Sequence, residues 1–198
     1  VDDLGLELVF GRTPAMNEIF ADSLKTFSNV CNGCFKVIYT LATKLAVERG
    51  IGYVVTGLSR GQIFDSRLKE IFHNGFLDVG DIDGMIIDAR RAYHRVDDAV
   101  RRCMDTSVFD DERVFEQVRY VDFYRYCDVE LAELYRFLDE KAPWVRPADT
   151  GRSTNCLIND VGIWVHKNER GYHNYAEPYS WDVRLGHKQR DAALAELD

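Results

Sequence analysis

Three cysteines in this chain have the residue type and spacing of metal ligands. Cys31 and Cys34 stand three positions apart where an apolar helix is expected to begin. Both thiols can therefore face one ion, and a helix N-terminus favours their thiolate forms. Cys156 follows far downstream in a polar stretch, 150–155, where a free cysteine has no packing role. Three thiolates without an obvious fourth suit an iron–sulfur cluster with one open iron position.

Other interpretations of the cysteines stay open at this point. Zinc is the main rival, with His166 or His173 as its fourth ligand. Redox chemistry is a further function of a Cys-x-x-Cys pair. Ordinary half-buried cysteines are the third interpretation, and it is weakened because Asn32-Gly33 between the two thiols is a turn sequence rather than core filling.

A second candidate site follows the short apolar segment 51–56. This segment is β-branched, aromatic and bounded by glycines, which predicts a central parallel strand buried on both faces. At the turn that follows, backbone amides and Arg60 could meet a phosphate, with Gly57 and Ser59 beside it. Plain turn chemistry is the competing explanation, because glycines are common in such turns for steric reasons alone.

The elements that must position these residues follow from hydrophobic periodicity. Helix, strand, turn and helix in that order are typical of a βαβ unit. We therefore predict an α/β fold with a partial parallel sheet and a helical C-terminal extension. Strands are expected over 4–10, 51–56 and 118–121, and helices over 13–24, 31–49, 62–72, 81–104, 129–138 and 187–197. Pro143 and Pro147 interrupt the periodicity, and residues 171–186 show little period.

Two clusters of side chains could contact a partner. The predicted helix 81–104 carries six basic residues, Arg90, Arg91, His94, Arg95, Arg101 and Arg102. They could bind RNA, a phosphorylated small molecule or an acidic carrier protein, but interleaved aspartates can pair with them and favour a solvated helix face. The aromatic tail could line a substrate pocket, act as a lid or dock another subunit; it consists of Trp164, Tyr172, His173, Tyr175, Tyr179 and Trp181.

Composition limits the class of protein. The chain has 198 residues, 46% of them hydrophobic, so it can bury a core. A net charge of −8 disfavours nucleic acid as a partner. Five cysteines without a secretory leader or membrane-spanning run predict a soluble, cytoplasmic protein in a reducing compartment. Cys103 and Cys127 have apolar neighbours, and for these two a structural role is favoured.

With these residues in view, the chain resembles the later part of the PP-loop, or N-type, ATP pyrophosphatases. The likeness is to the branch of tRNA-thiolation enzymes and sulfur-inserting synthetases, and it spans residues 4–79 and 121–156. In cluster-bearing members, a Cys-x-x-Cys at a helix start and one distant cysteine bind a [4Fe-4S] cluster, and Cys31, Cys34 and Cys156 match that order. The family also places a strand ending in glycine and polar residues beside the adenylate. The segment from Gly57 to Arg60, with Ser59 between them, is similar to that element.

Two departures from the family pattern shape the expectation. Arg60-Gly61-Gln62 stands where tRNA-modifying members have Gly-His-Asn/His-x-Asp-Asp, which favours a small-molecule or carrier-bound substrate over tRNA. The family's Ser-Gly-Gly-x-Asp-Ser loop, which lies upstream of this region, is not found in these residues. We therefore expect Val1 to begin partway into a longer protein whose missing N-terminal segment binds ATP and Mg²⁺, and we expect this piece alone to be inactive.

The resemblance implies a partial, Rossmann-like adenine nucleotide alpha-hydrolase fold. Residues 1–80 would be the C-terminal part of the PP-loop ATPase domain, and residues 81–198 a mostly helical extension with the Cys156 loop and the aromatic tail. The whole protein would adenylate a carbonyl or amide oxygen, release pyrophosphate and then transfer sulfur held at the open iron of the cluster. PP-loop enzymes are often dimers, so the resemblance also implies a possible homodimer.

Two other functions remain as alternatives. One keeps the adenylating fold and uses ammonia instead of sulfur, as related N-acetyl sugar amidotransferases do, with zinc on the cysteines. The other is not an enzyme: a zinc-stabilised α/β module that binds a partner through its aromatic tail and basic helix. The metal content of the protein would separate the first expectation from both of these.

Overall fold

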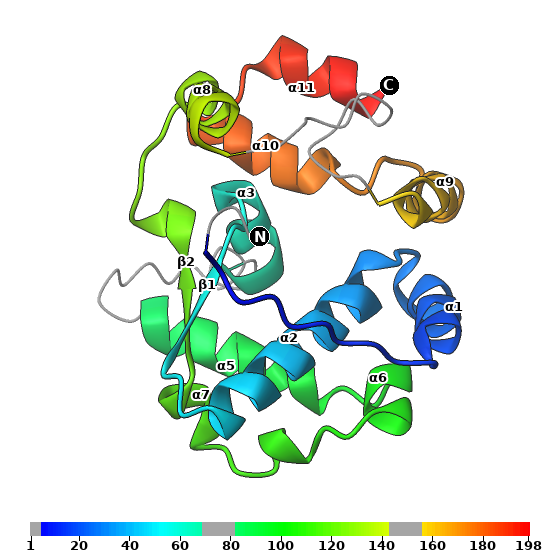
Figure 1. Cartoon of the computed structure of the whole chain (residues 1–198). Coiled ribbons are helices and arrows are strands. Elements are labelled where there is room, and N and C mark those ends of the chain that lie inside the picture. The colour runs from blue at the N-terminus through cyan, green and yellow to red at the C-terminus, as the bar shows by residue number, and fades with distance from the viewer. Residues whose placement is uncertain (1–4, 69–81, 143–155) are drawn as a thin grey trace.

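The computed structural model describes residues 5–68, 82–142 and 156–198. Within these ranges the fold is mixed α/β and mostly helical, with one short parallel sheet at the side of the helices (Figure 1). The elements, in chain order, are α1 (Met16–Phe27), α2 (Cys31–Glu48), β1 (Tyr53–Thr56), α3 (Arg60–Ile63), the π-helical turn η2 (Phe64–Leu68), α5 (Ile82–Arg95), α6 (Ala99–Cys103), η4 (Ser107–Phe109), α7 (Val114–Gln117), β2 (Arg119–Asp122), η5 (Phe123–Arg125), α8 (Leu131–Lys141), α9 (Ile158–Arg170), α10 (Ala176–Arg184) and α11 (Arg190–Leu197).

The sheet consists of β1 and β2, which run parallel with Tyr53 paired to Arg119. This confirms a strand at each of two predicted places. On the inner face, Val54 packs against an apolar cluster formed by Ala46, Val114, Phe115 and Val118. On the outer face, the side chains of Tyr53 and Val55 are 64% and 68% exposed. The expectation that this strand is buried on both faces is therefore wrong for the described residues, because no element in them covers the outer face.

The predicted N-terminal strand over 4–10 is also wrong, since residues 5–10 form no strand. Alternating apolar residues need a hydrogen-bonding partner to make a strand, and no strand of the described ranges pairs with this segment. It runs instead along α2. Glu7 forms an ion pair of 2.8 Å with Arg49, and a β-carbon on Gly11 would lie 2.7 Å from Leu41 Cδ1.

The predicted helix over 81–104 is divided in two. The break lies between α5 and α6, where Asp98 is the N-cap of α6 and accepts a hydrogen bond of 3.1 Å from the main-chain N–H of Arg101. A short acidic side chain that bonds to the backbone favours such a cap over continued helix. Asp98 also holds Lys36 of α2, with Nζ at 2.6 Å from Oδ2, and Lys36 is only 1% exposed.

The helix predicted over 62–72 begins earlier, at Arg60. Ser59 caps it and forms a capping box with Gln62, after which η2 continues the chain. Residues 69–72 of that predicted helix lie outside the described residues, as do Pro143, Pro147 and the polar stretch before Cys156. Where the structure describes the chain, no helix is long and apolar enough to cross a membrane.

The C-terminal part contains more helix than the pattern predicts. α8 and α11 confirm two expected helices, but α9 and α10 were not expected. The segment that forms α10 lacks a clear hydrophobic periodicity because polar as well as apolar residues lie on its buried face. Its Asp182 is buried, and its Trp181 stacks on Phe64 of η2 with ring centroids 5.1 Å apart. Pro178 lies in the first turn of α10, where a missing N–H is tolerated.

Candidate metal centre

The Cys-x-x-Cys pair lies where the sequence predicts it, at the start of a helix. α1 ends at Phe27, and its C-cap Ser28 adopts a left-handed conformation with φ of 55°. Asn29 Oδ1 then accepts a 2.7 Å hydrogen bond from the main-chain N–H of Cys31, the first residue of α2. Cys34 follows within the same first turn. Both thiols therefore lie in the first turn of α2, where the main-chain N–H of Cys34 is itself bonded to the carbonyl of Val30 at 3.3 Å.

Gly33, between the two cysteines, is required by helix packing. Its main-chain N–H donates a 3.0 Å hydrogen bond to Ser23 Oγ of α1. A β-carbon at this position would lie only 2.8 Å from Ile19 Cγ2. The interpretation of Asn32-Gly33 as a turn is therefore wrong, because the two residues belong to the first turn of α2 and the glycine lets α1 and α2 approach closely.

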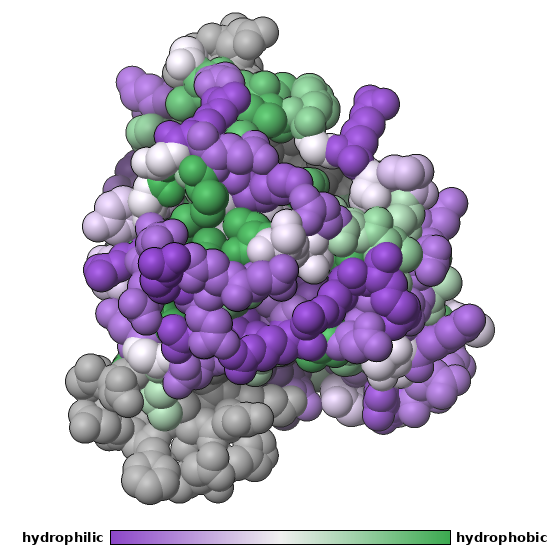
Figure 2. Space-filling model, turned by 90° about the horizontal axis from the view of Figure 1, so that it is seen from below, coloured by the Kyte–Doolittle hydropathy of each residue, from purple (hydrophilic) through white to green (hydrophobic). Residues whose placement is uncertain are grey.

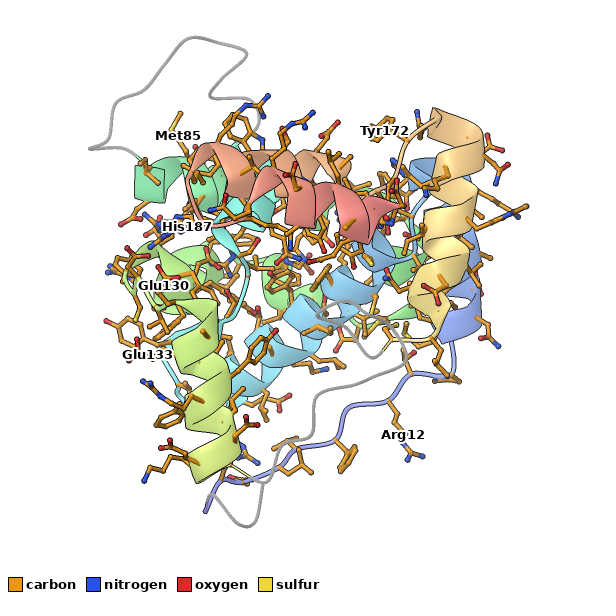
Figure 3. All side chains as sticks on the ribbon, turned by 90° about the horizontal axis from the view of Figure 1, so that it is seen from above. Arg12, Met85, Glu130, Glu133, Tyr172 and His187 are labelled. Atoms are coloured by element: carbon orange, nitrogen blue, oxygen red, sulfur yellow. The ribbon has the colours of Figure 1, made fainter. Side chains whose placement is uncertain are left out.

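The third cysteine is brought to the pair by α9, which lies beside the corner between α1 and α2 (Figures 1 and 3). Gly162 of α9 packs against the buried Val30, where a β-carbon would stand 3.0 Å from Val30 Cγ2. One turn earlier, Asn159 Oδ1 accepts a hydrogen bond from Cys31 Sγ at 3.6 Å. The main-chain N–H of Asn159 bonds in turn to the carbonyl of Cys156 at 3.0 Å.

The three sulfur atoms influence one another electrostatically. Burial, followed by the neighbouring Cys34 and Cys156 sulfurs, raises the pKa of Cys31 to about 11. Burial and then Cys156 also raise the pKa of Cys34. Each neighbouring thiolate disfavours the next, so a metal cation that binds all three would relieve this repulsion. The donor set thus fits a thiophilic metal or an iron–sulfur cluster.

The side chains are not already arranged around an ion. In residues 5–68, 82–142 and 156–198, no three His, Cys, Asp or Glu side chains are gathered closely enough to hold one. Cys156 is exposed, whereas Cys31 and Cys34 are partly buried. Binding would therefore draw Cys156 toward the other two.

The two histidines considered for zinc have other contacts. His166 Nδ1 lies 3.2 Å from the carbonyl oxygen of Ser28, and its ring packs edge-on against Tyr172. His173 is buried, and its Nδ1 accepts a 3.1 Å hydrogen bond from the main-chain N–H of Tyr175. Both rings thus help to hold the loop regions around α9.

The second predicted site, at the end of β1, is held together by contacts within the protein. Asp182 of α10 accepts hydrogen bonds from the main-chain N–H of Gly61 at 2.7 Å and from Ser59 Oγ at 3.2 Å. The Asp182 carboxylate therefore already accepts the hydrogen bond that the Gly61 amide could donate to a phosphate. Sequence reasoning missed Asp182, and its position 121 residues from Gly61 left no local signal.

Arg60 is likewise engaged by protein acceptors. Its Nε donates to the carbonyl of Tyr124 at 2.6 Å, and its Nη1 donates to Asp128 at 3.1 Å and contacts the ring of His187. Figure 3 shows His187 on the connection that follows α10. Space is open around Gly57, since a β-carbon there would meet no atom of the described residues within 4 Å. Arg60 thus joins the end of β1 to the segment after β2 and to the C-terminal part of the chain.

Helix α10 links the two candidate sites. Tyr175, immediately before α10, donates a hydrogen bond of 3.2 Å to Asn159 beside the cysteines. Asp182, seven positions further along, holds the turn after β1. Seven helical residues correspond to about 10 Å of helix length. In Figure 3, Tyr172 and His187 mark the two ends of this helix.

The basic helix is mostly paired. Arg90 and His94 are buried rather than available to a ligand. Arg91 bonds to Asp88 at 2.9 Å and to Glu116 at 3.1 Å. Arg102 bonds to Asp22 and Asp97, and Arg95 pairs with Glu112. These contacts support the interpretation of a charge-balanced helix face over that of an anion-binding patch.

Comparison of the chain with protein-family models, with curated proteins and with solved structures gives no match to any of them.

Proposed function

We propose that Cys31, Cys34 and Cys156 are the ligands of a [4Fe-4S] cluster in an ATP-dependent sulfur-transferring enzyme. The observation that supports this proposal is the position of Asn159, which bonds to the Cys31 side chain and to the backbone of Cys156, a cysteine 125 positions further along the chain. Packing of α9 on Val30 brings Cys156 close, but the exposed Cys156 side chain itself fills no core position. Three cysteines near one helix start are typical of a metal site.

The three cysteines would bind the cluster from two sides. Cys31 and Cys34 would hold the buried side, fixed by the contact of α2 with α1 through Gly33. Cys156 would hold the exposed side, where a substrate can approach. When bound, a cluster with three cysteine ligands supplies one iron without a protein ligand, to which sulfide can bind.

The ATP-dependent half of the proposal comes from the resemblance to PP-loop enzymes. In it, the whole protein adenylates an oxygen of a small-molecule or carrier-bound substrate, with ATP and Mg²⁺ held by a segment outside these residues. Gly57, Ser59 and Arg60 would lie beside the nucleotide, where a phosphate would have to compete with Asp182 for the Gly61 amide. The link through α10 supports a nucleotide and a metal centre close to each other.

The uncovered sheet face supports a further part of the adenylating domain. Parallel sheets are normally covered on both faces, yet Tyr53 and Val55 are exposed on the outer face of β1. Val47 and Ile51, near the end of α2 and the start of β1, are exposed as well. That end of the molecule lies at the bottom of Figure 1, and Figure 2, viewed from below, shows apolar patches among the polar surface. Further strands or helices of the same enzyme would cover such a surface.

The test is metal analysis of anaerobically purified and reconstituted protein. We expect a brown protein with broad visible absorption and about four irons per chain. Both features should be lost in Cys31→Ser, Cys34→Ser and Cys156→Ala. The matched controls Cys103→Ala and Cys127→Ala remove cysteines outside the site and should keep the cluster. Failure of the wild-type chain to bind any metal would overturn the proposal.

Other results would select an alternative. Colourless protein with one zinc per chain, lost in the same three variants, would exclude the cluster and favour the ammonia-using enzyme or the zinc-stabilised module. Folding of Cys31→Ser then decides between these two. If that variant unfolds, the zinc is structural, and if it stays folded without metal, a purely structural role is disfavoured.

A further inference from the structure

Asn159, in the first turn of α9, has an unbalanced set of hydrogen bonds. It is only 2% exposed, and its Oδ1 accepts from both Cys31 Sγ at 3.6 Å and Tyr175 Oη at 3.2 Å. Among the residues that the structure describes, its buried amide nitrogen Nδ2 has no hydrogen-bond partner. A buried N–H₂ group without an acceptor costs free energy, so the orientation of this amide calls for an explanation.

The Asn159 oxygen faces Cys31 because the Cys31 thiol donates a hydrogen bond to it, and metal binding would remove that donor. A cysteine sulfur that binds a metal carries no proton, so Cys31 could no longer donate to Oδ1. Rotation of the Asn159 amide by 180° exchanges its oxygen and nitrogen. Its two N–H groups would then face Cys31 Sγ and Tyr175 Oη, both of which can accept. After the rotation the amide oxygen, rather than the amide nitrogen, is buried without a partner. A buried C=O group without a partner costs less free energy than a buried N–H group without one.

We infer that Asn159 is a positioning residue of the metal centre, whose amide donates an N–H···S hydrogen bond to the metal-bound sulfur of Cys31. This inference rests on the proposed function. Tyr175 would hold the amide in place from its position at the start of α10, where its ring stacks on Tyr179 with centroids 5.7 Å apart. Hydrogen bonds to ligand sulfurs fix their orientation and tune the affinity and reduction potential of the metal.

The same residue also has a backbone contact with Cys156. The Asn159 main-chain N–H bonds to the Cys156 carbonyl, and the Asn159 side chain bonds to Cys31. Asn159 thus contacts both the Cys-x-x-Cys pair, through Cys31, and the distant Cys156. Its burial follows from the packing of α9 on Val30 through Gly162, one turn further along.

The experiment is a titration of the metal-free chain with Co²⁺, followed by the sulfur-to-cobalt absorption bands, in wild type and variants. Asn159→Leu keeps the size of the side chain and removes the amide, and it should weaken Co²⁺ binding about 10- to 100-fold. Asn159→Asp replaces the N–H donors with a carboxylate that repels the sulfur, and it should weaken binding further. Tyr175→Phe should have a smaller effect in the same direction. The control Asn168→Ala, on an exposed part of the same helix, should match wild type.

Stability of the metal-free proteins separates this role from a structural one. Asn159→Leu removes an unpaired buried amide, so its metal-free form should unfold at a denaturant midpoint close to that of wild type while its Co²⁺ affinity falls. Equal Co²⁺ affinity for wild type and both Asn159 variants would overturn the inference and leave the proposed function standing. If wild type itself binds no Co²⁺, iron or zinc, the proposed function fails and takes the inference with it.

Discussion

The main-chain N–H of Gly61, in the first turn of α3, donates a 2.7 Å hydrogen bond to Asp182 Oδ1 of α10. The two residues are so close that a β-carbon at position 61 would lie 2.8 Å from that same oxygen and would overlap the carbonyl oxygen of Pro178. This contact attaches the C-terminal helices to the turn after β1. Several consequences of this packing and of the buried charges can be measured.

Gly61→Ala should destabilise the fold, by about 1–3 kcal/mol or more, because the backbone of α10 must move to admit one methyl group. Gly57→Ala is the matched control. It lies four residues earlier in the same turn, with open space around it, and should change the free energy of unfolding little. Urea unfolding of both variants measures the difference. Equal stability of the two would show that α10 does not pack on α3 as described.

Arg60→Lys keeps the positive charge and should still cost about 1–3 kcal/mol, since a lysine cannot bond to Tyr124, Asp128 and His187 at once. The loss should appear in thermal unfolding of the protein without any nucleotide. A variant as stable as wild type would mean that the Arg60 contacts contribute nothing to the fold, which would leave its side chain available to a ligand.

The buried pair of Lys36 and Asp98 should respond strongly to removal of one partner. Lys36→Met leaves the Asp98 carboxylate without its cation and should cost about 3–5 kcal/mol. The double variant Lys36→Met/Asp98→Asn removes both charges and keeps a capping side chain for α6, so it should recover much of that loss. Chemical unfolding of the two single variants and the double variant measures the coupling. Additive effects would contradict a direct interaction.

Stability should also depend on pH through Lys36. Burial lowers the pKa of Lys36 from its ordinary value of 10.5, against the opposing effect of Asp98. Between the lowered value and 10.5, the unfolded chain binds a proton that the folded chain has released, so the Lys36 contribution to the free energy of unfolding rises with pH. The difference between wild type and Lys36→Met should therefore increase over this range. A difference that decreases would show that Asp98 raises the pKa of Lys36 instead.

Cys31 should react slowly with alkylating reagents in the metal-free protein. With its pKa raised to about 11, the thiolate fraction at pH 8 is about 100-fold lower than for an ordinary thiol, and the higher nucleophilicity of the thiolate offsets part of this. The net rate should be about tenfold lower than that of a model thiol. Iodoacetamide labelling followed by mass spectrometry measures it, with the exposed Cys156 as an internal comparison. Labelling of Cys31 at the rate of a model thiol would contradict its burial.

Local signals in the sequence were sufficient for elements with strong periodicity or clear ends. The apolar spacing of α2, the β-branched run of β1 and the periodicity of α8 each depend on neighbouring residues, so these elements were predicted close to their observed positions. The same holds for the helix start at Cys31. The strand over 4–10 failed for the opposite reason, because a strand needs a partner that its own residues do not specify.

The type of ligand and the spacing of Cys31 and Cys34 were determined by the sequence alone, since three positions within one helical turn place both thiols together. The approach of Cys156 was decided by the tertiary structure, through the packing of Gly162 on Val30. So were the hydrogen bond from Cys31 to Asn159 and the capture of the Gly61 amide by Asp182. These contacts join residues more than 100 positions apart, and only the packing of helices on one another brings such side chains within bonding distance.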